Sequence, residues 1–103
     1  MEYSLIIVTF PNREEAEKVS KELLVNKMVA CAQFEKIDSL YLWKGELASD
    51  EEVRVVYKTG KHRYHQLEQT ILELHPYEVP QIIEIEIRDG LDSYLDWIHS
   101  SLN

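Results

Sequence analysis

Cysteine is almost absent from this 103-residue chain: Cys31 is the only one, so no disulfide can form within it. Glycine and proline number three each, which argues against glycine-rich phosphate loops and proline-rich linkers. No apolar run approaches the roughly 20 residues that a membrane-spanning helix requires, and the first residues lack the order of a secretory signal. Together with the single thiol, these absences predict a protein of the reducing cytoplasm with no membrane partner.

Basic residues are also few. The chain has 11 Lys and Arg against 19 Asp and Glu, which gives a formal net charge of −8. A nucleic-acid binder gathers positive charge on one face, whereas the longest basic cluster here is residues 61–63. We therefore expect no nucleic-acid partner, and we interpret the acidic balance as a contribution to solubility rather than as a selective cation site.

Signatures of enzymes are missing as well. The sequence contains no nucleophile elbow and no His-Glu-x-x-His segment. None of its many carboxylates forms a pair that the sequence singles out for acid–base chemistry. We therefore predict that the chain is not an enzyme.

The hydrophobic content of 45% predicts one globular core, and the length predicts one domain over residues 1–103. Apolar periodicity indicates the order β-α-β-β-α-β-α. Two right-handed crossovers that share a central hairpin predict an α+β fold of the ferredoxin-like split-βαβ type, βαββαβ plus a C-terminal helix, with an antiparallel sheet. The expected elements are a strand at 5–10, a helix capped by Asn12, an extended segment at 29–43, a strand at 53–59, a helix at 61–74, a strand at 82–87 and a helix capped by Asp92.

The central hairpin has unusual features. Its first strand is long, and the apolar alternation slips near residues 36–38, which predicts a bulge. Lys44-Gly45 predicts the turn, and the acidic residues 49–52 predict an exposed tip between the strands.

One face of the predicted sheet lacks a cover. We expect Tyr41, Trp43 and Tyr57 on the face away from the two central helices, where one short C-terminal helix is too small to shield them. Packing against copies of the same chain is the simplest answer. Tyr41 and Trp43, like Tyr94 and Trp97, are therefore assigned to a core or subunit interface in preference to a ligand platform.

Two groups of side chains could bind metal. The thiol of Cys31, between two alanines, could bind Cu(I) or Zn(II), or the residue could be a small buried hydrophobe in a strand. His62 and His65 are three residues apart on one helix, but no third ligand is placed beside them, so a solvated pair is the preferred interpretation.

The segment His75-Pro76-Tyr77-Glu78-Val79-Pro80 holds an imidazole, a phenol and a carboxylate on a short loop that two prolines stiffen. Such a loop can present a binding site with little conformational freedom to lose. It can equally be a rigid connector between a helix and a strand. The residues alone leave both interpretations open.

Several segments resemble the CutA family of divalent-cation tolerance proteins, in register over nearly the whole chain. They are Ala30-Cys31-Ala32-Gln33, Tyr41-Leu42-Trp43-Lys44-Gly45, Lys58-Thr59, His75-Pro76-Tyr77-Glu78-Val79-Pro80 and Tyr94-Leu95-Asp96-Trp97-Ile98. The resemblance implies ferredoxin-like homotrimers that share their architecture with PII signalling proteins and are associated with copper binding, with no established reaction. Gln33 and Leu42 depart from the family, where Asn and a second aromatic residue are common.

The resemblance assigns roles to individual positions. The leading hypothesis is a trimeric, metal-responsive protein in which Cys31, His75 and Glu78 bind copper(II) or another divalent cation. The alternative is a PII-like signalling or scaffolding trimer, whose clefts between subunits hold a small anionic ligand or a partner protein through Lys58 and Tyr77. The sequence identifies no protein partner.

Overall fold

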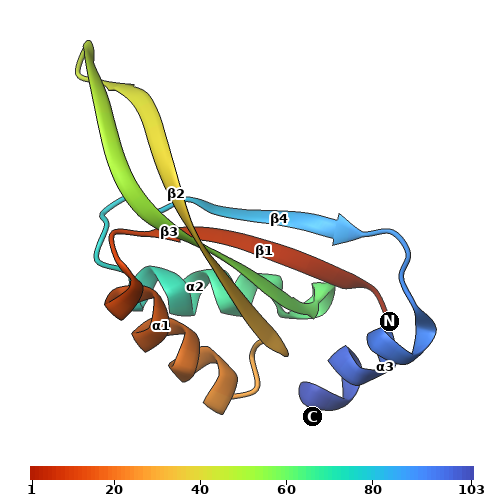
Figure 1. The fold of residues 1–103 in the computed structure, drawn as a ribbon. Helices are drawn as coiled ribbons and strands as arrows, with labels where there is room; N and C mark the ends of the chain where they lie inside the picture. Colours follow the sequence, from red (N-terminus) through yellow and green to blue (C-terminus); the bar gives the residue numbers. More distant parts are fainter.

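The computed structural model describes all residues 1–103 and has the predicted element order (Figure 1). The elements are β1 (Tyr3–Phe10), α1 (Arg13–Val25), β2 (Cys31–Trp43), β3 (Glu46–Gly60), the 3-10 turn η1 (Lys61–Arg63), α2 (Tyr64–Leu74), β4 (Ile82–Ile87) and α3 (Asp92–Ser101). The four strands form one antiparallel sheet in the order β2-β3-β1-β4. The fold prediction is confirmed.

The helix ends follow local rules. Asn12 caps α1 as predicted, because its side chain accepts a hydrogen bond of 2.9 Å from the main-chain N–H of Glu15. Helix α2 ends at Leu74, since the residue before Pro76 is extended. The predicted cap at Asp92 is wrong: Leu91 occupies the cap position without a side-chain bond, and Asp92 lies in the first turn of α3.

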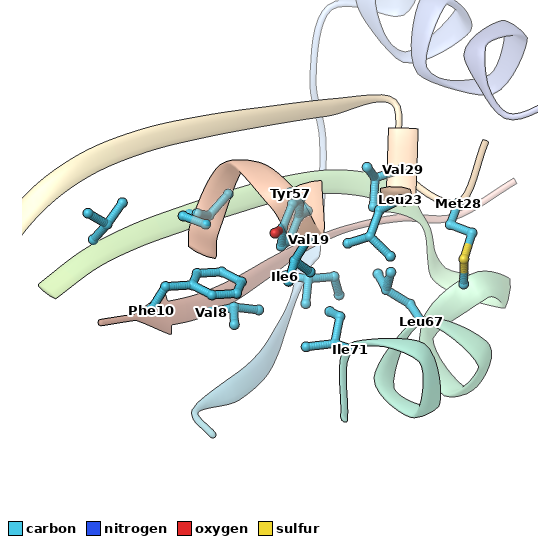
Figure 2. Close-up of a cluster of buried hydrophobic side chains, with 13 residues drawn as sticks. Ile6, Val8, Phe10, Val19, Leu23, Met28, Val29, Tyr57, Leu67 and Ile71 are labelled. Carbon is cyan, nitrogen blue, oxygen red and sulfur yellow. The ribbon is translucent and has the colours of Figure 1, made fainter. Parts of the chain in front are cut away.

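The core lies between the sheet and helices α1 and α2 (Figure 2). Alternate residues of β1 point into it, and the helices contribute one apolar face each. Its buried members are Ile6, Val8, Phe10, Ala16, Val19, Leu23, Met28, Val29, Val53, Val55, Tyr57, Leu67 and Ile71. Helix α3 packs separately, at the end of the sheet where β1 begins, through Ile98 and Leu102 against Ala30.

The placement of Tyr57 on the uncovered face was wrong. Tyr57 alternates in phase with Val53 and Val55, so its ring is fully buried on the helix side of the sheet. Its hydroxyl forms a hydrogen bond of 2.8 Å with the hydroxyl of Ser20 on α1. The phenol is therefore a core residue with a satisfied polar end.

The central hairpin is regular from end to end. Strands β2 and β3 pair without interruption from Cys31 opposite Lys58 to Trp43 opposite Glu46, so the bulge predicted at 36–38 is absent. Residues 49–52 belong to β3 and pair with β2, so the prediction that they form the tip is wrong. The tip is Lys44-Gly45, and positive φ angles of 52° and 80° make it a type I′ turn.

Residues 37–52 form a two-stranded arm that extends past the last β1–β3 pair, Phe10 opposite Val53 (Figure 1). It carries exposed apolar side chains on both faces: Leu40, Leu42 and Leu47 are 70–72% exposed on one face, and Trp43 is 64% exposed on the other. This double exposure explains the slip in alternation, because no core selects one face of the arm. A two-stranded hairpin alone is marginally stable in water.

The sheet face opposite α1 and α2, here named the open face, also carries exposed apolar side chains. Ile83 and Ile85 of β4 lie there, because they pair with Ile7 and Leu5 on the side away from the core. None of the helices is long and apolar enough to cross a membrane.

Candidate functional site

His75 is fixed at the start of the proline-flanked loop. Its ring is buried, with 8% of the residue exposed, and stacks on Phe10 with the ring centroids 4.6 Å apart. Nδ1 accepts a hydrogen bond of 3.0 Å from the main-chain N–H of Tyr77, and Nε2 lies 2.8 Å from the carbonyl oxygen of Thr9. These partners require a neutral ring that carries its proton on Nε2. Burial lowers the pKa of His75, in agreement with that state.

Tyr77 connects the same loop to the base of the arm. Its hydroxyl donates a hydrogen bond of 3.0 Å to Oε2 of Glu52. Partial burial is the main cause that raises the pKa of Tyr77 to about 12, and this hydrogen bond is the second. Farther along the arm, the hydroxyl of Tyr41 donates to Asp50, which raises the pKa of Tyr41. Sequence reasoning missed Glu52, because it assigned residues 49–52 to a solvated tip.

A second group of candidate residues lies on the open face. Cys31 is half-buried and free, directly across from Lys58. The Lys58 ammonium group donates a hydrogen bond of 2.8 Å to Oε1 of Gln33 and lies 5.3 Å from the ring centroid of Tyr94. The structure thus brings Cys31, Gln33 and Lys58 together, with α3 supplying an aromatic neighbour.

The two groups are far apart within one chain. Lys58, the partner of Cys31, pairs on its other side with Leu5, whereas His75 contacts Thr9 four residues farther along β1. At about 3.3 Å per residue, this offset is roughly 13 Å along the strand. No group of three or more His, Cys, Asp or Glu residues is arranged to hold a metal ion. Cys31 therefore does not meet His75 and Glu78 in a single protomer.

The remaining candidates are placed as follows. Tyr41 and Trp43 lie on the arm, on the face continuous with the open face, and both are exposed. His62 lies in η1 and His65 in the first turn of α2, with no third metal ligand. Glu78 is exposed on the proline-flanked loop.

A pocket of about 540 Å³ lies between the N-terminal turn of α1 and the base of the arm. Charged side chains of both signs line it, including Lys36, Asp38 and Glu51. None of the predicted site residues lines this pocket, although Glu52, the hydrogen-bond partner of Tyr77, does.

Known proteins resemble this chain along nearly its whole length. Residues 4–101 match the family model described as CutA1 divalent ion tolerance protein. The divalent-cation tolerance protein CutA of Pyrococcus horikoshii is 40% identical over 94 residues, which cover 91% of this chain and 92% of that protein. The structure of the periplasmic divalent cation tolerance protein CutA from Archaeoglobus fulgidus matches with a TM-score of 0.95 at 32% identity, over 98% of this chain and 99% of that one. CutA1 from Oryza sativa matches with a TM-score of 0.96 at 28% identity, over 100% and 95%.

Proposed function

Because this chain belongs to the CutA1 family of divalent ion tolerance proteins, we propose that it acts in divalent-cation tolerance as a homotrimer that binds copper(II) or a similar cation. The observation that carries the assembly is the unpartnered apolar surface of the arm and the open face. Strands β2 and β4 are the sheet edges and have free main-chain donors and acceptors. A neighbouring copy would cover the apolar side chains and pair these edges. The expectation that the assembly contains three copies of the chain rests on the family resemblance.

Light scattering in dilute buffer tests the assembly. We expect a mass about three times the chain mass of 12.2 kDa. A stable monomer at micromolar concentration would contradict the trimer and any site between subunits.

The proposed metal site combines residues of different copies. Within one chain Cys31 lies far from Glu78 and His75, so a common ion would be shared by Cys31 of one copy and the proline-flanked loop of the next. His75 could join only by Nδ1, and only after losing the bond from Tyr77 N–H. Thiolate and imidazole donors favour copper over magnesium or calcium.

Competition with a copper(II) chelator at neutral pH tests this site. We expect Cys31→Ser and Glu78→Gln to weaken copper(II) binding at least tenfold, because each removes one ligand. His65→Gln is the matched control, since His65 is exposed and lies outside the proposed site. If only the His65 variant loses affinity, the binding is adventitious surface chemistry.

The alternative is a PII-like signalling trimer, and the setting of Lys58 favours it. Its ammonium group is held by Gln33 and faces Tyr94 without a carboxylate partner, as an anion-binding lysine would be. Binding of inorganic sulfate through Lys58 should weaken with salt and change little across the histidine titration range, because sulfate stays fully ionised there. Copper(II) binding should instead weaken as pH falls through that range. One series of titrations in salt and pH separates the two functions.

We assign the protein to the cytoplasm, because its single cysteine is free. The relative from Archaeoglobus fulgidus is named a periplasmic protein. Cell fractionation distinguishes the two compartments.

A further inference from the structure

The pocket between the start of α1 and the base of the arm is lined by charged side chains of both signs. Its volume of about 540 Å³ is within the range of small-molecule sites, roughly 300–1,000 Å³. Arg13 and Lys36 supply positive charge there, and Asp38 and Glu51 supply negative charge. None of the residues that the family resemblance assigns to a site lines this pocket.

The strand register places these charges on the helix side of the hairpin. Phe34 packs against the core, and Lys36 and Asp38 follow it at intervals of two residues, so all three lie on the same face of β2. Asp38 is directly opposite Glu51 of β3, which is in phase with the buried Val53. The two carboxylates are therefore neighbours on the wall of the pocket.

This pair of like charges has no compensating partner within the chain. Like charges directly opposite each other destabilise an antiparallel pair, and neither Asp38 nor Glu51 forms an ion pair. On the other face of the same hairpin, Glu35 is opposite Arg54 and forms an ion pair with it at 2.7 Å. The hairpin therefore neutralises the opposed charges on the face away from the pocket and leaves two carboxylates free on the face that borders it.

Positive charge lies beside the two carboxylates. Nε of Arg13 donates a hydrogen bond of 3.0 Å to Glu17, and the guanidinium group lies over the ring of Phe34, 4.2 Å from its centroid. These contacts orient the Arg13 side chain and use only Nε, so its Nη groups remain available to an anion. Residues two apart on a strand are about 6.6 Å apart, and at this spacing Lys36 and Asp38 present opposite charges to the pocket.

The arrangement of charges indicates the class of ligand. A guanidinium group suits the two carboxylates, because its planar set of donors can bond to both at once. A carboxylate suits Arg13 for the same reason. We propose that this pocket binds an amino acid with a guanidinium side chain, whose cation lies between Asp38 and Glu51 and whose carboxylate contacts Arg13 and Lys36. This binding is a further function, independent of divalent-cation tolerance.

Calorimetric titration of the whole protein with L-arginine tests this site. Two analogues separate the contributions, since citrulline lacks the positive charge of the side chain and agmatine lacks the carboxylate. We expect L-arginine to bind and each analogue to bind at least tenfold more weakly, because each loses charge-assisted hydrogen bonds. Absence of L-arginine binding would overturn the proposal. Agmatine bound as tightly as L-arginine would also overturn it, because the pocket would then be no more than an acidic surface.

Variants of the two charged walls complete the test. Glu51→Gln should weaken L-arginine binding at least tenfold without lowering the urea midpoint of unfolding, because it also relieves the repulsion with Asp38. Arg13→Gln should weaken binding of L-arginine at least tenfold and leave that of agmatine unchanged. An unchanged L-arginine affinity in either variant would refute the site, and a less stable Glu51→Gln protein would refute the repulsion on which it rests.

Glu46→Gln is the matched control, because Glu46 is an exposed residue of the same strand outside the pocket. It should leave L-arginine binding unchanged. If it weakened binding as much as Glu51→Gln does, the ligand would be attracted by the net charge of −8 alone and the proposal would fail. Cys31→Ser should not alter L-arginine binding, so this site and the proposed copper(II) site can fail independently.

Discussion

Replacement of His75 by alanine separates a structural role of this histidine from a metal-binding one. In the folded chain the ring satisfies the carbonyl of Thr9 and the main-chain N–H of Tyr77 and stacks on Phe10. The contacts with Thr9 and Phe10 link the proline-flanked loop to the end of β1, and the bond from Tyr77 holds the loop itself. His75→Ala removes them together and leaves two polar main-chain groups without their partners.

The expected loss of stability follows from these contacts. A hydrogen bond contributes about 1 kcal/mol, and more where a buried partner stays unsatisfied. The stacked ring contributes about 0.5–1.5 kcal/mol beyond its buried area. We therefore expect His75→Ala to lower the free energy of unfolding by about 3 kcal/mol, which is a large effect for one residue.

Urea unfolding at a fixed protein concentration measures this loss, since the stability of an assembly depends on concentration. His65→Ala is the matched control, because this exposed histidine should change stability by no more than about 0.5 kcal/mol. A His75→Ala protein as stable as the parent would refute the structural role. If that protein also lost copper(II) binding, His75 would be a metal ligand instead.

Three further predictions concern pH, assembly and partners. Because the pKa of His75 is lowered, the folded protein holds fewer protons than the unfolded chain just below pH 6.5. The free energy of unfolding, measured in urea, should therefore fall as the pH drops below that value. A flat pH profile there would contradict the neutral ring. Trp43→Glu should dissociate the assembly in light scattering, because it would bury an unpaired charge, and an unchanged mass would exclude Trp43 from the interface. A random DNA duplex should show no mobility shift at physiological salt, because the net charge is −8; a salt-sensitive complex would mean that assembly creates a basic surface.

The fold could be predicted because its signals are local. The cap at Asn12, the stop at Pro76 and the alternation of residues 82–87 each depend on neighbours within a few residues. The turn at Lys44-Gly45 also set the pairing register of β2 and β3. Such features can be identified in the sequence without any knowledge of the tertiary structure.

The wrong predictions concern features that depend on residues far apart in the sequence. Val53, Val55 and Val56 are all apolar, so alternation alone could not show which face of β3 carries Tyr57; its partner Ser20 is 37 residues away. Residues 49–52 are mostly exposed, as their acidity suggested, yet they pair along the whole arm. Charge indicates contact with water and gives no information on main-chain pairing.

The sequence allowed candidate site residues to be named but did not predict how they are arranged. The partners of His75 and Tyr77 are Thr9, 66 residues away, and Glu52, 25 residues away. No sequence spacing links them. The offset of roughly 13 Å along β1 likewise follows from the strand register and not from the order of the motifs.

The contacts within one chain divide the family positions into two kinds. Bonds to Thr9 and Glu52 already explain why His75 and Tyr77 are the residue types they are. Cys31 and Glu78 have no such explanation, since the first is a half-buried free thiol and the second an exposed carboxylate, and neither side chain forms a hydrogen bond or ion pair in the chain. A side chain without an internal partner is available to a ligand or a neighbouring copy. Binding at the family positions should therefore depend first on Cys31 and Glu78, while His75 and Tyr77 hold the loop that presents Glu78.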